Sequence, residues 1–181
     1  MPTPRPLSTS LVVALERAEM VHRLNVLCRS ERAAVHTYEQ ALDTKCLRSI
    51  FGVLRQNRTC HLSRVALLCE RIAALGGAPA MSKGVWGSFL SSFDGPALAL
   101  GRSIAVAVLE EGEARVQRAY DAEGDAVDTT TQRPLLRRLR AAQEATQKAI
   151  VALHEPSPMA PRAIAKRGAP GLESTSLESA E

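Results

Sequence analysis

The stretch Glu31–Tyr38 reads ERAAVHTY, and 82 residues later the stretch Glu113–Tyr120 reads EARVQRAY. Each places a glutamate seven residues before a tyrosine, inside a run whose apolar residues recur at steps of three and four. That spacing is typical of one face of an α-helix. The same offset relates five further pairs: Asp43 and Asp125, Leu54 and Leu136, Arg58 and Arg140, His61 and Gln143, and Leu68 and Ile150. A repeat of this length with two helices per copy predicts a duplicated helical hairpin.

Length and composition predict one globular domain. The chain has 181 residues, of which 45% are hydrophobic and 23% charged, and such a chain can bury a substantial core. Aromatic residues make up only 3%, so the core has to be built from aliphatic side chains. This composition is typical of a helix bundle, because β-sandwiches and barrels carry more Tyr, Phe and Trp.

The net charge of +4 and the isoelectric point near 9.1 raise the question of a nucleic-acid partner. The arginines are interspersed with glutamates along the expected helices, and aromatic residues that could stack on bases are scarce. We therefore expect no nucleic-acid partner. No stretch approaches the roughly 20 apolar residues of a membrane span, and we expect no membrane partner either.

The four cysteines, Cys28, Cys46, Cys60 and Cys69, form no Cys-x-x-Cys pair. This spacing argues against a zinc knuckle or a thioredoxin-type site. We expect buried free thiols in a reducing compartment. The apolar run before Glu16 is too short for the core of a signal peptide, so a soluble cytoplasmic protein is predicted.

Proline and glycine divide the chain into three parts. Residues 1–9 contain three prolines and predict a flexible N-terminal arm. Residues 10–154 predict an all-α, up-down four-helix bundle made of two related hairpins with a long crossover connection. Residues 155–181 contain four prolines and no periodic apolar face, which predicts a disordered tail.

The expected helix ends follow from capping residues. We expect Ser8 or Ser10 to cap the first helix and Asp43 or Thr44 the second. Gly76-Gly77 followed by Pro79 predicts the end of the second helix, because glycine adopts the left-handed cap conformation. In the second hairpin the expected signals are Asp94 at the start of the third helix, Gly124-Asp125 at its end, and Thr129–Thr131 with Pro134 at the start of the fourth.

These features resemble the ferritin-like superfamily of four-helix bundles. The overall pattern is most similar to an uncharacterised bacterial family in that superfamily, a domain of unknown function. Its members run from a Leu-Asn, as at Leu24-Asn25, to a Leu-Gly-Gly-x-Pro, as at Leu75–Pro79. Rubrerythrins are more distantly similar and share the Glu-x6-Tyr pattern and the helix-ending Gly-Gly. The resemblance covers residues 24–154.

The resemblance implies where a di-metal site would lie. In the metal-binding members each first helix gives a glutamate and each second helix gives Glu-x-x-His. Glu31 and Glu113 match the first-helix glutamates, and His61 matches the first histidine. The remaining positions have changed: Arg58 and Arg140 stand in place of the two motif glutamates, and Gln143 stands in place of the second histidine. A six-ligand iron centre would thus be degenerate, with three candidate ligands left.

Arginine at two of these positions changes the chemistry. A guanidinium stays protonated and repels a dication, but its planar fork of donors fits a carboxylate. We therefore expect Arg58 and Arg140 to lie opposite Glu31 and Glu113 and to neutralise them without metal. The predicted buried network contains six residues: Glu31, Arg58, His61, Glu113, Arg140 and Gln143. Tyr38 and Tyr120 are expected to pack in the core with one hydrogen bond each.

Three functional hypotheses follow. The first is a non-enzymatic bundle protein of the bacterial cytoplasm that acts through its surface, with a protein partner or as a homo-oligomer; the resemblance implies a stress-related or scaffolding role. The alternative is an iron- or manganese-binding protein of the oxidase type, with Glu31, His61 and Glu113 as ligands. The third is an adaptor whose tail, residues 155–181, folds on a partner. No catalytic residue is assigned, because no nucleophile has a neighbouring base and no glycine-rich phosphate loop is present.

Overall fold

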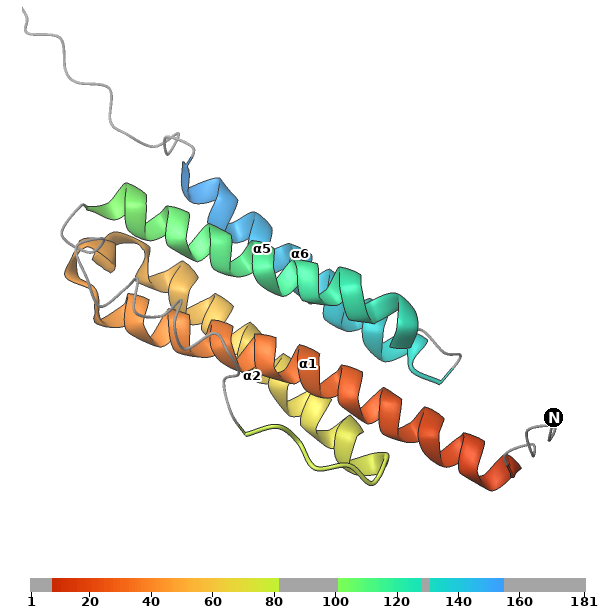
Figure 1. Ribbon diagram of the computed structural model, residues 1–181. Helices are drawn as coiled ribbons and strands as arrows, with labels where there is room; N and C mark the ends of the chain where they lie inside the picture. Colours follow the sequence, from red (N-terminus) through yellow and green to blue (C-terminus); the bar gives the residue numbers. More distant parts are fainter. Residues whose placement is uncertain (1–7, 82–100, 128–130, 155–181) are drawn as a thin grey trace, which may run out of the picture.

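The computed structural model describes residues 8–81, 101–127 and 131–154 (Figure 1). Within these ranges the chain forms helices and no strand. The elements are α1 (Thr9–Asp43), the 3-10 helix η1 (Lys45–Ile50), α2 (Phe51–Ala74), α5 (Arg102–Val127), α6 (Arg133–Val151) and the 3-10 helix η3 (Ala152–His154). The predicted all-α four-helix bundle is confirmed.

Two antiparallel hairpins, α1 with α2 and α5 with α6, lie side by side (Figure 1). Helix α1 contacts both α2 and α5, and α6 contacts both α5 and α2, so the four helices close into a ring. Helices α2 and α5 run in the same direction (Figure 1). The strict up-down alternation expected from the sequence therefore does not hold between the second and third helices. The connection between them, residues 82–100, lies outside the described residues.

The two copies of the repeat are arranged symmetrically. The offset of 82 residues places α1 on α5 and α2 on α6, and each helix runs antiparallel to its copy (Figure 1). Two hairpins related in this way share a twofold axis that crosses the bundle near its middle. Residues that match under the offset therefore lie at equivalent places on opposite sides of this axis, as Leu54 and Leu136 do in two separate apolar clusters.

The first hairpin departs from the predicted helix ends at one place. Ser8 caps α1, and its hydroxyl accepts a bond of 3.4 Å from Leu11 N; α1 then runs without a break for 35 residues. Thr44 does not cap the next helix through its side chain, because its hydroxyl donates to the carbonyl of Gln40. The chain forms η1 first, and α2 begins only at Phe51.

The two motifs on which the resemblance rests contact each other. Gly76 has a φ of 76°, and Gly77 N donates to the Ile72 carbonyl, which ends α2 as predicted. Asn25 on α1 donates from Nδ2 to the Ala78 carbonyl (3.1 Å) and accepts from Ala80 N (2.6 Å). The asparagine thus fixes the chain that follows Gly-Gly against α1.

In the second hairpin, α5 continues through Gly124 to Val127, so the expected end at Gly124-Asp125 is wrong by a few residues. Helix α6 begins at Arg133 with Pro134 in its first turn, and Gln132 takes the position before it. The expected caps Asp94, Thr129 and Thr130 lie outside the described residues. So do residues 1–7 of the expected arm and all of the expected tail.

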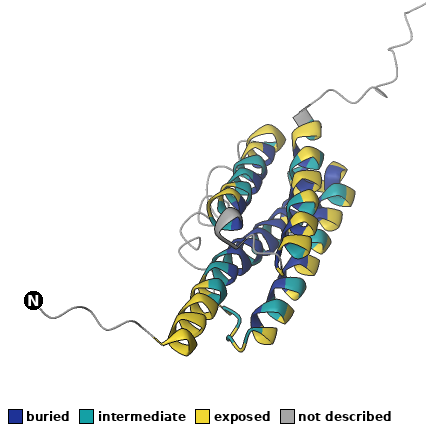
Figure 2. Cartoon of the chain, turned by 90° about the vertical axis from the view of Figure 1, so that its right-hand side faces the viewer, coloured by how far each residue is buried: buried dark blue, intermediate teal, exposed yellow. Residues whose placement is uncertain are grey.

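The core is aliphatic, and its buried side chains line the inside of the ring (Figure 2). One apolar cluster includes Leu24, Leu27, Leu68, Ile72, Leu136 and Leu139. A second includes Ala41, Leu47, Leu54, Leu109 and Ile150. On α2, α5 and α6 the buried polar residues lie between the two clusters. The bundle therefore carries a polar layer across its middle.

Candidate functional site

The polar layer receives side chains from all four helices. Its members are Glu31 and Tyr38 from α1, Asn57, His61 and Arg64 from α2, Glu113 and Tyr120 from α5, and Gln143 and Thr146 from α6; each is at most 2% exposed. Charged side chains are rarely buried to this extent unless they are paired. How the two carboxylates are paired is therefore the central question about this site.

His61 bridges the two carboxylates. Its Nδ1 lies 2.7 Å from Glu31 Oε2, and its Nε2 lies 2.9 Å from Glu113 Oε1. Both ring nitrogens can donate only when the imidazole carries two protons. Burial lowers the pKa of His61, but the charges of Glu31 and Glu113 and their hydrogen bonds outweigh it and raise the pKa above its ordinary value. The geometry thus favours an imidazolium.

Arg64 supplies the second cation. Its Nε donates to Glu31 Oε1 at 2.7 Å, and its Nη2 donates to Gln143 Oε1 at 2.9 Å. Two carboxylates, one guanidinium and one imidazolium bring the formal charge of the layer to zero. Arg64 Nη2 also lies 2.7 Å from His61 Nδ1. His61 Nδ1 donates to Glu31 when it carries a proton and accepts from Arg64 when it does not. The protonation of Nδ1 therefore decides which of the two contacts is a hydrogen bond.

The two tyrosines each bond the glutamate of the other hairpin. Tyr38 donates to Glu113 Oε1 (2.5 Å), and Tyr120 donates to Glu31 Oε1 (2.7 Å). Burial and the facing carboxylate raise the pKa of both phenols well above the ordinary value, so both remain donors. Asn57 supports one of them by donating to Tyr38 Oη at 2.9 Å. The expectation of core packing with a hydrogen bond is confirmed for both.

Glu113 is held by the counterparts of the residues that hold Glu31. Gln143 Nε2 donates to Glu113 Oε2 at 2.7 Å, and Thr146 Oγ1 donates to the same oxygen at 3.0 Å. Under the 82-residue offset these two positions correspond to His61 and Arg64. Each glutamate is therefore bonded by two side chains from the second helix of its own hairpin and by the tyrosine of the other hairpin.

These donors keep both glutamates ionised. Burial raises the pKa of each carboxyl group, but the charge of His61 and the hydrogen bonds outweigh it, aided by Arg64 at Glu31 and by Tyr38 and Gln143 at Glu113. The net effect is a lowered pKa for both. All four carboxylate oxygens accept at least one hydrogen bond.

Four of the six residues predicted for the buried network come together: Glu31, His61, Glu113 and Gln143. The expectation that Arg58 lies opposite Glu31 is wrong, because its guanidinium bonds Glu39 at 2.7 Å on the surface and its side chain is 36% exposed. Arg140 is also not opposite Glu113: its Nη2 donates to the Tyr120 carbonyl, about two turns further along α5.

The predicted network lacked Arg64, Asn57 and Thr146, although the apolar stripe of the fourth helix predicts that Thr146 is buried. Arg58 and Arg64 lie three residues to either side of His61, so the helical period places them at similar angles, roughly 60°, from it. The repeat gave no help, because Arg64 corresponds to a threonine in the second hairpin. A useful signal was present at Asn57, which continues the inner stripe through His61 at a step of four.

The residues of the layer do not fit the di-metal centre that the resemblance implies. The structure brings Glu31, His61 and Glu113 together, but each imidazole nitrogen bonds a different carboxylate. Neither nitrogen therefore has a free lone pair for a metal ion. The permanent cation of Arg64 contacts both Glu31 and His61. Among the described residues, no group of three or more His, Cys, Asp or Glu side chains is placed to hold a metal ion.

Comparison of the chain with protein-family models, with curated proteins and with solved structures finds no match. In the described ranges no helix is both long and apolar enough to span a bilayer. The polar layer and the surface of the bundle are therefore the features of this protein that point to a function.

Proposed function

We propose that this chain is a non-enzymatic, ferritin-like bundle protein of the bacterial cytoplasm, in which a buried ion-pair network takes the place of a di-metal centre. The network consists of Glu31, His61, Arg64, Glu113 and Gln143. Its role is structural: it fixes the register of the four helices and leaves the outer surface to carry a scaffolding or stress-related function. The four cysteines suit the cytoplasm, where thiols stay reduced.

The position of Arg64 carries this proposal. Its Nε is 2.7 Å from a carboxylate oxygen that a metal ion would need, and its side chain is 2% exposed. A guanidinium cannot give up its charge to make room for a dication. Arg64 and His61 together supply the two positive charges that neutralise the two glutamates.

Metal analysis tests the proposal. The full chain, purified without chelators and then incubated with iron(II) or manganese(II), should carry neither ion after desalting. Its melting temperature should be the same with and without EDTA, and iron(II) in air should oxidise no faster with the protein than in buffer. Stoichiometric iron or manganese together with a melting temperature lowered by EDTA would favour the alternative, a metal-binding oxidase-type protein.

Exposed apolar side chains at the start of α1 favour self-association as the function of the outer surface. The first turns of α1 expose four apolar side chains: Leu11 (44%), Val12 (38%), Val13 (48%) and Leu15 (55%). Exposed apolar groups gathered on one helix end lose contact with water when a second copy covers them. Light scattering should therefore give a dimer for the wild type and for the control Val151→Glu, and a monomer for Leu15→Glu. A monomeric wild type would contradict self-association.

A further inference from the structure

Two cysteines lie in contact between α1 and α2. Cys28 Sγ and Cys69 Sγ are 3.8 Å apart, although 41 residues separate them in the chain. Cys28 is fully buried in the first apolar cluster, and Cys69 is partly exposed at its edge. A disulfide needs sulfurs about 2.05 Å apart. Rotation of the two side chains has to bring the sulfurs closer by only about 1.8 Å.

A guanidinium lies against the more accessible sulfur. Arg32, one turn beyond Cys28 on α1, donates from Nη2 to Cys69 Sγ at 3.4 Å. Within the described residues its Nε has no hydrogen-bond partner. Cys69 therefore combines partial exposure, a hydrogen bond from a guanidinium and a second thiol in contact.

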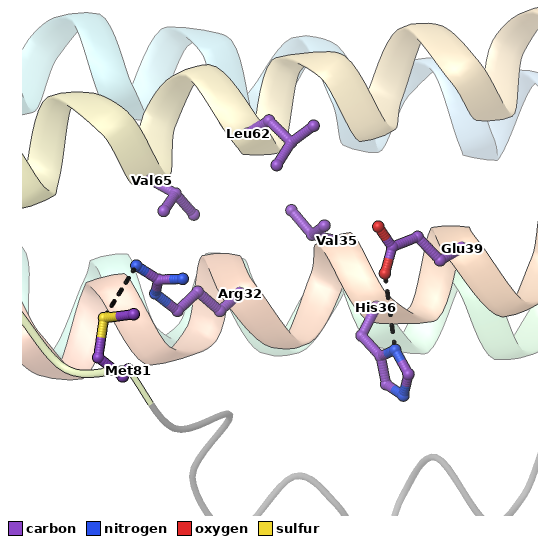
Figure 3. Close-up of a pocket in the computed structure, with 7 residues that line it drawn as sticks. All are labelled: Arg32, Val35, His36, Glu39, Leu62, Val65 and Met81. Carbon is purple, nitrogen blue, oxygen red and sulfur yellow. Dashed lines mark hydrogen bonds and ion pairs between the residues drawn. The ribbon is translucent and has the colours of Figure 1, made fainter.

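Solvent reaches this guanidinium through a small pocket. Arg32 and Met81 line a pocket of about 160 Å³ between α1 and α2, together with Val35, Leu62 and Val65 (Figure 3). In Figure 3 Arg32 points toward the thioether of Met81, 4.0 Å from Nη2. The pocket is large enough to admit water-sized molecules, and hydrogen peroxide is only slightly larger. A small oxidant can thus come within reach of the side chain that bonds Cys69.

We propose that Cys28 and Cys69 form a redox pair that hydrogen peroxide converts into an intramolecular disulfide. The sulfur of Cys69 attacks one peroxide oxygen, the O–O bond breaks, and the departing hydroxide takes up the proton of the thiol to become water. The resulting sulfenic acid at Cys69 is then attacked by the sulfur of Cys28, which loses its proton as hydroxide leaves and becomes the second water. Two thiols lose two electrons in total, and one peroxide is reduced to two waters.

The surroundings assign different roles to the two sulfurs. Burial raises the pKa of the Cys28 thiol, so it remains protonated and protected until a sulfenic acid forms beside it. Cys69 reacts first because it is the more exposed of the two sulfurs and is bonded to Arg32. The disulfide would tie α1 to α2 one turn from Glu31, and closing a loop of this length stabilises the folded hairpin. This inference does not depend on the proposed function of the polar layer.

The test uses the reduced full chain with one equivalent of hydrogen peroxide at pH 7, followed by alkylation and peptide mass mapping. We expect loss of two thiols, a mass lower by about 2 Da, and one cross-linked peptide pair joining Cys28 to Cys69. The variant Cys46→Ser/Cys60→Ser is the matched control and should give the same product. Arg32→Gln should slow the loss of thiols several-fold.

Single cysteine variants separate the two steps. Cys28→Ala should leave Cys69 as a sulfenic acid that dimedone traps, whereas Cys69→Ala should leave Cys28 unlabelled. Alanine fills the buried position without a new polar group, and circular dichroism checks that both variants fold. The proposal is overturned if peroxide oxidises Cys46 or Cys60 as fast as Cys69, or if both thiols remain while Met81 gains oxygen.

Discussion

Replacing Arg64 by methionine is the most direct perturbation of the polar layer. Methionine keeps an unbranched, flexible apolar stem but removes the charge-assisted bond to Glu31 (2.7 Å) and the bond to Gln143 (2.9 Å). The two carboxylates are then left with one cation, His61. Breaking a buried ion pair by removing one partner costs about 3–5 kcal/mol, mainly because the remaining charge stays buried without compensation.

This loss translates into a large change in melting temperature. For a domain of this size, each kcal/mol lowers the melting temperature by about 2–4 °C, so Arg64→Met should melt about 6–20 °C below the wild type. Arg58→Met is the matched control on the same helix. Its ion pair with Glu39 is partly exposed on both sides (36% and 43%), and such pairs contribute about 0–1 kcal/mol.

Thermal unfolding followed by circular dichroism at pH 7 measures both variants. The double variant Arg64→Met/Glu31→Gln adds a second comparison, because it removes one negative charge along with the positive one. It should be more stable than Arg64→Met alone, with a coupling that a double-mutant cycle reports. The reasoning is refuted if Arg64→Met melts within a few degrees of Arg58→Met, or if removing the Glu31 charge brings no recovery.

Three further predictions concern the same core. The pKa of His61 is raised by folding, so the stability that His61 contributes is complete below its ordinary pKa and is lost as pH rises through the raised value. The stability that the two network glutamates contribute is lost as pH falls, because folding lowers their pKa. His61→Gln should therefore abolish only the fall in melting temperature on the alkaline side, and an unchanged alkaline slope would contradict this. Tyr38→Phe and Tyr120→Phe each remove a buried bond to a carboxylate and should lower the free energy of unfolding by about 1.5–3 kcal/mol, measured in urea; a neutral result for both would rule out these bonds. A Cβ at Gly77 would lie 2.5 Å from an α1 side chain, whereas one at Gly52 meets nothing within 4 Å, so Gly77→Ala should destabilise by about 1–3 kcal/mol while Gly52→Ala stabilises, and equal melting temperatures would be the contrary outcome.

Much of the fold could be predicted because apolar periodicity and turn residues act locally. The steps of seven, seven and four through Leu54, His61, Leu68 and Ile72 place these residues on the buried face of α2, and the structure buries all four. Gly76-Gly77 ends the helix, as the conformational freedom of glycine predicts. The relative direction of α2 and α5 could not be predicted from the sequence, because no local signal specifies how two hairpins pack.

The candidate site shows the same division. Glu31, His61, Glu113 and Gln143 could be assigned to the core because each lies on an apolar stripe. The identity of the cation could not, since periodicity places Arg58 and Arg64 at similar angles from His61. The packing of α2 distinguishes the two arginines. Arg64 donates to the Gln143 side chain on α6, whereas Arg58 donates to Glu39 at the surface of α1.

The amino-acid pattern alone predicts two related helical hairpins with two glutamates on buried faces. Helix formation and burial follow from patterns that extend over a few turns, and such patterns can be recognised in the chain. Three features follow only from how the helices pack: the cation that neutralises those glutamates, the bond from each tyrosine to the glutamate of the other hairpin, and the contact of Cys28 with Cys69. These pairings join residues on different helices, and a contact across a bundle depends on the packing of all its members at once.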